Sequence, residues 1–519
     1  MDVFFIFSSV AFFMWSIRSI FYFVNKWQSI VGEGLTTKSS FLYVFSSFFT
    51  PLSFITWLGV IFSIYVSVSD FPLEYDQYFI LILFIVKAIV VLKEISNRKF
   101  RLPQFNSQVI IIITLSVLLT CVAFAFPFSE RYLWLLILDR LLFIFVIIPI
   151  FLVMFPAEII DDFKVRKAIR EIRRYKKLQT VLFIGKDSDQ IAYYTEQLLQ
   201  NNKEIVVVRD PYMRMSVIGK TILTDVNDRT EYLFIICQTT TRLDVESILQ
   251  EISFSTIFLS RAGSSDEQDK LLQKLIPFIT KQHRFMIDSS YDNEKLKNKK
   301  IKPLFFDTYI DNDKAILALV SLRQKRGNLE INLRYKEEKM LFIVPLIGEY
   351  NSVYIIPALL FLFLDGIKKP EIQNTLQAIS PIPGQLVEHK LHSGVTILDA
   401  TLVRDSFVLK QGLNYLKLYK KNKVIVFAIE DEFLPHEIKD LKNELLLATS
   451  ILVLREKHSL LIRKLMRIGT DKIEVRTIPY DSVRKLVRNR LLPNDIVLFI
   501  GEKASPIIES IILSSSTTQ

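Results

Sequence analysis

The stretch PIPGQLVEHKLHSGVTILDATLVRDS, which runs from Pro381 to Ser406, decides how the chain is divided into domains. Two prolines and a glycine at its start predict a rigid turn through which neither a helix nor a strand can continue. Residues 395–399 are predicted to form a short buried strand, and Asp405 is predicted to cap the helix that follows. A rigid turn followed by strand, loop and helix is typical of a hinge, so a new domain is expected to begin at residue 381.

The same stretch resembles the hinge of the Mur ligases, which are ATP-dependent amide ligases that build the stem peptide of peptidoglycan. The D-alanyl-D-alanine-adding members of that family show a PVPGR-like hinge and, after the next strand, a DDTYNANPDS-like loop. The corresponding segments here are residues 381–385 and 399–406, with Gln385 in place of the family's arginine and Ala400 in place of its second aspartate. The resemblance implies that the substrate-loop positions are Gln385, Asp399, Thr401 and Asp405.

Three further segments resemble the family's motifs in the family's order. Residues 346–351 (LIGEYN), with the Asp-Gly-Ile turn at residues 365–367, are similar to its LxGxHN segment and LGI turn. Residues 492–501 (LPNDIVLFIG) are similar to its closing PGDVVLVKGS strand, and residues 211–222 to its TPxSYNTxxG stretch. Together with the hinge, these matches imply the central and C-terminal domains of a Mur ligase.

Beyond residue 179, strand and helix patterns alternate at short spacing, which predicts a parallel, doubly wound sheet. Residues 314–345 are predicted instead as antiparallel strands around residues 326–328. The expected organisation is an α-helical transmembrane domain at residues 1–156, a basic amphipathic linker helix at 157–178, a central Mur-ligase-like parallel-sheet domain with a degenerate ATPase site at 179–380, and a smaller Rossmann-like α/β domain at 381–519.

The first 156 residues are rich in apolar side chains, and about five transmembrane helices are predicted there. The five apolar runs are residues 3–24, 39–69, 78–92, 109–128 and 132–155. The loop after the third run and the segment after the fifth are basic, and basic loops remain in the cytoplasm. We therefore expect a multi-pass protein of the cell (inner) membrane, with its N-terminus outside and residues 156–519 in the cytoplasm. This membrane domain stands where the family has a nucleotide-sugar domain.

The net charge of +11 suggests nucleic acid at first, but the basic residues cluster next to the apolar runs. Anionic lipid headgroups are the expected partner at such positions, and no nucleic-acid partner is expected. Two roles remain open for the linker helix at residues 157–178. It is either a strut on the lipid surface or an ordinary helix that packs on the next domain.

Several polar residues are expected to have structural or solvent-exposed roles. Asp139 and Arg140 are expected to form a structural ion pair near the end of the fifth apolar run. Cys121 and Cys237 are interpreted as reduced, buried thiols. His389 and His392, three residues apart, fall on a predicted hairpin, where both are expected to be solvated, and no metal site is predicted.

Catalysis by a Mur ligase needs a loop that cradles the ATP phosphates, with a lysine and a hydroxyl that binds Mg²⁺. That loop follows the first strand of the central domain, where this chain has the sequence GKDSDQ at residues 185–190. The G-x-x-x-x-G-K-[ST] pattern is missing, Gln190 stands where the family has lysine, and two carboxylates repel a triphosphate. One interpretation is an ordinary turn into a helix capped by Asp187. The candidate phosphate contacts are Gly185, Lys186 and Ser188.

The other catalytic positions that the resemblance implies are also altered. The strand that ends in a metal-binding glutamate in the family ends here in Cys237, and Tyr350 replaces the histidine of the LxGxHN segment. Asn351 is retained, and Lys270 is a candidate for the family's carbamylated lysine, with an exposed helical lysine as the competing interpretation. The Gly-Lys-Thr sequence at residues 219–221 follows no strand, and it is predicted to lie on a helix.

Three functions remain open from the sequence. The first is a membrane-anchored Mur-ligase-like protein that has lost catalysis and acts as a scaffold or regulator of peptidoglycan and cell-envelope synthesis. Its partners would be the lipid bilayer and proteins of cell-envelope synthesis, and no cofactor is predicted for it, whereas the family uses ATP and magnesium. The second is a divergent but active ATP-dependent ligase, and the third is a membrane transporter with a regulatory cytosolic domain.

Overall fold

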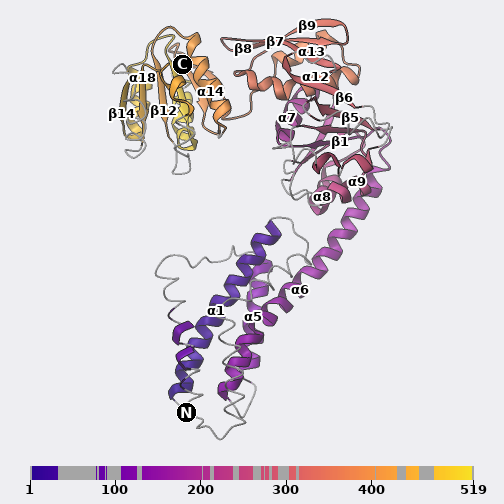
Figure 1. Ribbon diagram of the computed structural model, residues 1–519, viewed down its shortest axis with the longest axis vertical. Coiled ribbons are helices and arrows are strands. Elements are labelled where there is room, and N and C mark those ends of the chain that lie inside the picture. The colour runs from indigo at the N-terminus through magenta and orange to yellow at the C-terminus, as the bar shows by residue number, and fades with distance from the viewer. Residues whose placement is uncertain are drawn as a thin grey trace. The chain divides into compact units, whose positions relative to one another are not determined.

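The structure of the protein, a computed structural model, consists of two compact units (Figure 1). The helical unit comprises Met1–Glu171 and Arg214–Leu223, and the α/β unit comprises Ile172–Met213 and Thr224–Gln519. The residues that the structure describes are 3–32, 78, 81–83, 85–87, 89, 107–125, 131–200, 203–210, 215–237, 245–260, 270–273, 275–279, 283–289, 291, 303–310, 315–403, 405–428, 440–454 and 473–516.

Three long helices make up most of the described helical unit (Figure 1): α1 (Val3–Gly32), α5 (Ser107–Phe124) and α6 (Arg131–Ile172). Within the described residues, two segments are long and apolar enough to cross a membrane, Ser107–Phe124 and Trp134–Val153. The predicted span at residues 39–69 lies outside the described residues, and the span at 78–92 is described only in part. Because α6 continues to Ile172, the expected linker helix is not a separate element over residues 157–172.

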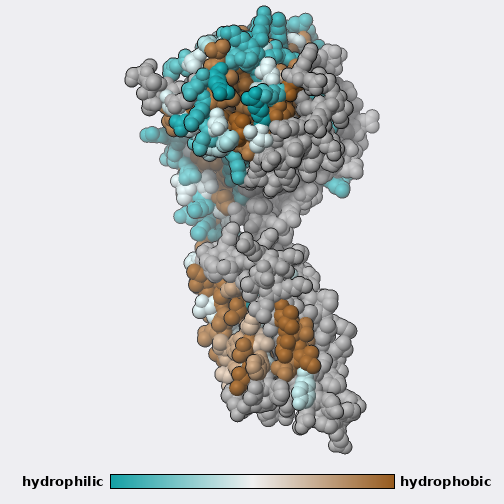
Figure 2. All heavy atoms as spheres, turned by 90° about the vertical axis from the view of Figure 1, so that its left-hand side faces the viewer, coloured by the Kyte–Doolittle hydropathy of each residue, from teal (hydrophilic) through white to brown (hydrophobic). Residues whose placement is uncertain are grey.

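Large apolar side chains lie on the outside of the helical unit. Ile110, Leu118 and Val122 of α5 are all exposed, and only 22% of the apolar segment of this helix is buried inside the protein. Figure 2 shows hydrophobic residues gathered on the visible face of this unit. Cys121 is also exposed on α5, so its prediction as a buried thiol was wrong. An apolar surface of this extent is typical of contact with lipid or with another apolar partner.

A fully buried ion pair lies inside the helical unit. Lys87 Nζ is 2.7 Å from Asp139 Oδ1, and both side chains are completely buried. The same ammonium group lies 5.1 Å from the centre of the Trp15 ring. Asp139 therefore pairs with Lys87, which comes from a different part of the chain. The sequence had suggested its neighbour Arg140 as the partner. Removing one member of a buried pair costs about 3–5 kcal/mol, so this pair holds α6 to the segment that carries Lys87.

Helix α8 (Met215–Asp225) contains the Gly-Lys-Thr sequence at residues 219–221, as predicted. Gly219 is buried against α6, and a Cβ atom at this position would lie only 3.1 Å from Val165 Cα. Glycine is needed where two backbones approach this closely. The position thus has a packing role in the helical unit, and the sequence is not part of a phosphate loop.

The central domain of the α/β unit is built on a nine-stranded sheet in the order β2-β3-β1-β4-β5-β6-β7-β8-β9. Its strands are β1 (Gln179–Ile184), β2 (Glu204–Arg209), β3 (Thr230–Cys237), β4 (Thr256–Leu259), β5 (Arg284–Asp288), β6 (Leu304–Ile310), β7 (Leu317–Lys325), β8 (Asn328–Tyr335) and β9 (Glu338–Val344). From β2 to β7 in this order, including β1, neighbouring strands pair in parallel. Strand β8 pairs antiparallel with both β7 and β9. The predicted parallel and antiparallel parts are both confirmed, and they form one continuous sheet because β6 joins them.

The strand sequences and one apolar helix explain this arrangement. Strands β1, β3 and β4 are buried over nearly their whole length, as expected where both faces of a sheet are covered. Helix α12 (Ser352–Leu364) is apolar on all sides, which is typical of a core helix, and it packs against β6, β7 and α7 (Ser188–Leu199). The shorter elements of this domain are α9 (Val245–Glu251), η1 (Ile276–Phe278), η2 (Glu349–Asn351) and α13 (Lys369–Gln377).

The turn at residues 365–367, which resembles the family's LGI turn, ends helix α12. Gly366 has a φ of +82° and donates its N–H to the carbonyl oxygen of Phe363, while Ile367 donates to that of Leu362. This pair of hydrogen bonds is the Schellman motif, which places a left-handed residue, usually glycine, directly after the helix. The motif at this position therefore reflects helix termination.

The C-terminal domain of the α/β unit is built on a six-stranded sheet in the order β10-β11-β15-β12-β13-β14. Strand β10 pairs antiparallel with β11, and the other pairs are parallel. Separate apolar clusters cover the two faces, so this is the predicted smaller α/β fold. Its elements are β10 (Val387–Lys390), β11 (Thr396–Ala400), α14 (Ser406–Tyr415), η3 (Leu416–Leu418), β12 (Lys423–Phe427), α16 (Lys442–Leu445), β13 (Ser450–Val453), β14 (Glu474–Thr477), α18 (Tyr480–Asn489), β15 (Ile496–Ile500), η4 (Glu502–Ala504) and α19 (Ser505–Ser516).

Two aspartates fix turns in the C-terminal domain. Asp405 accepts a hydrogen bond of 2.8 Å from the Phe407 N–H, so its predicted role as the N-cap of α14 is confirmed. Asp495, in the segment LPND, is fully buried. Its carboxylate accepts hydrogen bonds from the Leu492 N–H and from both the backbone and the side-chain amide of Asn422. A buried carboxylate with three donors is a structural element, so this part of the motif needs no ligand.

Candidate functional site

The turn between β1 and α7 occupies the place where the resemblance puts the phosphate loop. Only residues 185–187 separate the end of β1 from Ser188, the first residue of α7. The Gly185 N–H donates to the carbonyl oxygen of Cys237 at 3.1 Å. The buried hydroxyl of Ser188 donates to the same oxygen at 2.9 Å. Both hydrogen bonds tie this short turn to the end of β3.

The groups of this turn that would bind a nucleoside triphosphate with Mg²⁺ contact the protein itself. The Ser188 hydroxyl, which would have to bind the metal, is directed at a backbone carbonyl. Asp187 and Asp189 place two carboxylates at the N-terminus of α7, and Asp189 pairs with Arg209 at 3.2 Å. Acidic side chains stabilise this end of a helix, but they repel the anions that it would otherwise bind.

Two further residues of this turn differ from what the sequence predicts or the family requires. Asp187 occupies the N-cap position of α7, but its side chain makes no capping hydrogen bond, so that prediction was wrong. Gln190 lies in the first turns of the helix, and its amide oxygen is buried without a hydrogen-bond partner in the described part of the chain. An uncharged amide at this position cannot neutralise a phosphate as the family's lysine does.

A chain of hydrogen bonds between α7 and η2 engages the retained asparagine of the LxGxHN segment. Tyr194 donates from its hydroxyl to Asn351 Oδ1 at 3.1 Å. The Asn351 amide group donates in turn to the carbonyl oxygens of Ile347 and Gly348, at 2.8 and 3.2 Å. Burial raises the pKa of Tyr194 well above its ordinary value, so the phenol remains a hydrogen-bond donor. Asn351 therefore binds other parts of the protein with both ends of its amide.

Tyr350 stands where the family has a histidine, and its side chain packs against the hinge. Its hydroxyl donates to the carbonyl oxygen of Gln385 at 3.1 Å, and burial raises its pKa. Gly348 has a φ of +97°, and a Cβ atom at that position would collide with the Tyr350 ring. The phenol thus fills the space next to the hinge and joins the two domains, a role different from that of a metal-positioning imidazole.

The predicted substrate-loop residues of the C-terminal domain also lie against the hinge. Asp399 Oδ1 accepts a hydrogen bond of 2.9 Å from the Thr401 N–H, which forms a local Asx turn. The next residue, Leu402, donates its N–H to the carbonyl oxygen of Gly384 at 3.0 Å. Gly384 has a φ of +68°, and a Cβ atom at this position would collide with the Leu402 side chain. The loop is therefore held on the hinge by backbone contacts.

One contact brings the two halves of the candidate site together. Lys186 Nζ, from the β1–α7 turn, lies 3.9 Å from Asp405 Oδ2, from the C-terminal domain. Both side chains are exposed, so this pair contributes at most about 1 kcal/mol, but it shows that the two loops face each other. Lys270 is exposed on a helical segment, residues 270–273, and the nine residues before it lie outside the described part. In the described residues, no group of three or more potential ligands could hold a metal ion.

Sequence reasoning missed the aromatic residues that surround this site. Tyr193 donates to the carbonyl oxygen of Pro381 at 3.3 Å, and the ring of Tyr354 stacks on that of Tyr194 with centroids 6.3 Å apart. The adjacent tyrosines in α7 were the available signal, because bulky side chains directly after the turn leave less room for a nucleotide. The acidic residue Glu388, near the hinge, was also missed, since nothing in its sequence neighbourhood indicates that it is buried.

Comparison with solved structures reveals a shared fold. The MurF ligase of Thermotoga maritima in complex with ADP is 14% identical, with a TM-score of 0.52 over 69% of this chain and 85% of that chain. MurF from Acinetobacter baumannii is 11% identical, with a TM-score of 0.55 over 67% and 79%. A UDP-N-acetylmuramoyl-L-alanyl-D-glutamate–2,6-diaminopimelate ligase is 14% identical, with a TM-score of 0.53 over 68% and 82%. No protein-family model and no curated protein sequence matches this chain. At these identities the likeness is one of fold.

Proposed function

We propose, on the premise that the α/β unit has the Mur ligase fold, that this chain is a membrane-anchored, catalytically degenerate protein of that fold. It acts as a scaffold or regulator of peptidoglycan and cell-envelope synthesis at the cytoplasmic face of the membrane. Its partners are the lipid bilayer and proteins of that synthesis, and it needs neither ATP nor magnesium.

The observation that carries this proposal is the closed turn after β1. A phosphate loop gains affinity from backbone N–H groups that surround the phosphates, from a lysine and from bound Mg²⁺. Here the Gly185 N–H and the Ser188 hydroxyl are both engaged by the carbonyl oxygen of Cys237. A nucleotide would have to break these buried hydrogen bonds and also approach the carboxylates of Asp187 and Asp189.

Contacts between the two domains support a role as a scaffold, because they hold one relative orientation. Arg326, in the turn between β7 and β8, donates from its guanidinium to the carbonyl oxygen of Leu418 at 2.8 and 2.5 Å. The guanidinium carbon also lies 4.5 Å from the centre of the Tyr419 ring. The neighbouring Gly327 N–H donates to the hydroxyl of Tyr415 at 2.7 Å. We call this set of contacts the interdomain latch.

Membrane attachment is supported by the apolar segments of α5 and α6 and by their exposed apolar side chains. The basic residues that follow the apolar part of α6 support a cytoplasmic location for that end of the helix. In this arrangement the α/β unit lies in the cytoplasm and the N-terminus lies outside, as the loop charges predict.

Genetic complementation tests whether catalysis is needed. In cells that lack the protein, a full-length Lys186→Ala, Gln190→Ala variant is expected to restore growth and cell shape as well as the unaltered protein does. The amount of each protein in the membrane fraction is measured by immunoblotting, so that a folding defect is recognised. Failure of a normally abundant variant to complement contradicts the proposal and favours the divergent ligase.

A further inference from the structure

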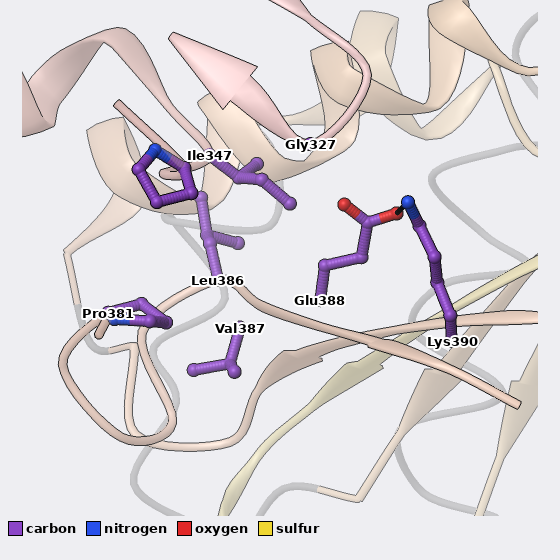
Figure 3. A pocket seen from close by; sticks show the side chains of 8 residues that line it. Gly327, Ile347, Pro381, Leu386, Val387, Glu388 and Lys390 are labelled. Atoms are coloured by element: carbon purple, nitrogen blue, oxygen red, sulfur yellow. Dashed lines mark ion pairs between the residues drawn. The ribbon is translucent and has the colours of Figure 1, made fainter. Parts of the chain in front are cut away.

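A cavity of about 350 Å³ lies where the β7–β8 turn meets the hinge and the first strand of the C-terminal domain. Figure 3 shows the side chains around it, with Glu388 and Lys390 on one side and apolar groups on the other. The volume is at the lower end of the range of small-molecule sites, which runs from about 300 to 1,000 Å³. Its place between two domains is also typical of such sites.

Glu388 is the charged group of this cavity. Its side chain is only 9% exposed, although it carries a carboxylate. Tyr415 donates to Glu388 Oε2 at 3.2 Å, and Tyr419 donates to Oε1 at 3.1 Å. A carboxylate offers about four acceptor positions, so the two phenols leave part of its capacity for another donor. In Figure 3 the carboxylate points toward Ile347 and Gly327, across the cavity.

The cations near Glu388 compensate its charge only weakly. Lys390 Nζ lies 3.9 Å from Glu388 Oε1, which is beyond hydrogen-bond distance, and its side chain is 73% exposed. Arg326 lies in the adjacent turn, but its guanidinium is bound to the Leu418 carbonyl and to the Tyr419 ring. A buried carboxylate is stable only when it is paired, so this site favours an additional cation.

The opposite wall of the cavity is apolar. Pro345 and Ile347 contribute from the segment after β9, while Pro381 and Leu386 contribute from the hinge. These side chains offer no hydrogen bonds, so they suit the hydrocarbon part of a ligand. A ligand that satisfies both walls has one cationic group and a short apolar body.

We propose that this cavity binds a small organic ammonium ion, whose charged group is held by Glu388 and whose hydrocarbon part lies against the proline- and leucine-lined wall. The ligand would touch the hinge and the turn that carries the interdomain latch, so its binding would stabilise the observed orientation of the two domains. The proposal does not depend on whether the β1–α7 turn binds nucleotide, because the two sites share no residue.

The test is calorimetry of the full-length protein in nanodiscs of zwitterionic lipid, with empty nanodiscs as the blank. The probes are n-butylammonium and benzylammonium chloride, and the matched neutral probes are n-butanol and benzyl alcohol. Saturable binding of at least one ammonium ion is expected, with the corresponding alcohol bound about tenfold or more weakly. Absence of saturable binding by both ammonium ions, or equal binding of the alcohols, overturns the proposal.

Three variants locate the site. Glu388→Gln keeps the shape of the side chain and removes its charge, so it is expected to weaken ammonium binding about tenfold or more. Val387→Phe narrows the cavity and leaves the carboxylate in place, so it reports on the same site if Glu388→Gln does not fold. Lys390→Met removes the competing cation and is expected to keep or increase the affinity. Wild-type affinity in both of the first two variants overturns the proposal.

Discussion

Ser188 Oγ and the carbonyl oxygen of Cys237 lie 2.9 Å apart, and the hydrogen bond between them closes the turn after β1 against the end of β3. In the Mur ligases a hydroxyl on this turn is expected to face Mg²⁺, and the strand corresponding to β3 is expected to end in a metal-binding glutamate. Here the two positions bind each other. Metal and nucleotide would therefore compete with a buried hydrogen bond of the protein itself.

Glycine substitutions test the packing of Tyr350 against the hinge. Gly348→Ala is expected to lower the free energy of unfolding of the α/β unit by about 2–4 kcal/mol, because a left-handed conformation is strained and the new methyl group meets the Tyr350 ring. Gly366→Ala is the matched control, since Gly366 has a similar φ of +82° but no atom within 4 Å of the new methyl group. Denaturant unfolding followed by circular dichroism gives both values. Equal losses for the two variants would show that Tyr350 does not pack as described.

The interdomain latch predicts an effect of Arg326 on the mobility of the two domains. Arg326→Ala removes the hydrogen bonds to the Leu418 carbonyl and the contact with the Tyr419 ring, so the distance distribution between spin labels in the two domains is expected to broaden. Arg323→Ala, which changes an exposed arginine of the preceding strand β7, is the control and is expected to leave the distribution unchanged. An unchanged distribution in Arg326→Ala would contradict the latch.

His389 predicts that stability falls in mild acid. It lies half-buried on β10, so its prediction as a solvated residue was wrong, and burial lowers its pKa, although Asp399 opposes this effect. Its pKa in the folded protein is therefore below the ordinary value of 6.5. As the pH falls through 6.5, the unfolded chain binds the proton before the folded protein does. The free energy of unfolding therefore decreases, by at most about 1.4 kcal/mol per pH unit for one proton.

Substitution of this histidine should reduce the pH dependence. His389→Gln is expected to flatten the decline in unfolding free energy between neutral pH and mild acid, while the same change at the exposed His392 should not. Part of the decline will remain, because burial also lowers the pKa of His283. Urea unfolding at a series of pH values measures the slopes, and identical slopes for His389→Gln and the unaltered protein would refute this assignment.

The sheets could be predicted from the sequence because buried strands covered on both faces are short apolar runs with regular spacing. Strand β6 was missed, since Asp307 and Thr308 follow its two phenylalanines and interrupt the apolar pattern. The continuity of α6 was missed because the composition changes from apolar to basic near residue 156. A helical backbone does not depend on that change, and the helix continues.

The candidate site could be predicted only as far as the loss of motifs. The missing phosphate-loop pattern and the replacement of histidine by Tyr350 are visible in the sequence. What occupies the lost positions depends on contacts between distant residues, such as Ser188 with the Cys237 carbonyl. The pairing of Lys87 with Asp139 and the burial of Glu388 were unpredictable for the same reason, because no local pattern specifies a partner on another element.

Cysteine labelling tests the proposed membrane orientation. In a variant with both native cysteines replaced by serine, a single cysteine at position 76 is expected to react with an impermeant maleimide in intact cells, whereas one at position 300 should react only after lysis. Both positions lie outside the described residues, so this expectation rests on the distribution of charged residues along the sequence. Labelling of position 300 in intact cells would contradict the proposed orientation.

The most direct test of the central claim is calorimetry of Mg-ATP with the full-length protein in nanodiscs. Each charge-assisted contact that is lost from a phosphate loop costs about 1.5–3 kcal/mol, so the loss of several should weaken a micromolar site by about three orders of magnitude. We expect no saturable binding at sub-millimolar nucleotide, and the same result for Lys186→Ala and Ser188→Ala. Saturable micromolar binding that disappears in Lys186→Ala would contradict the account and establish a divergent, ATP-binding site.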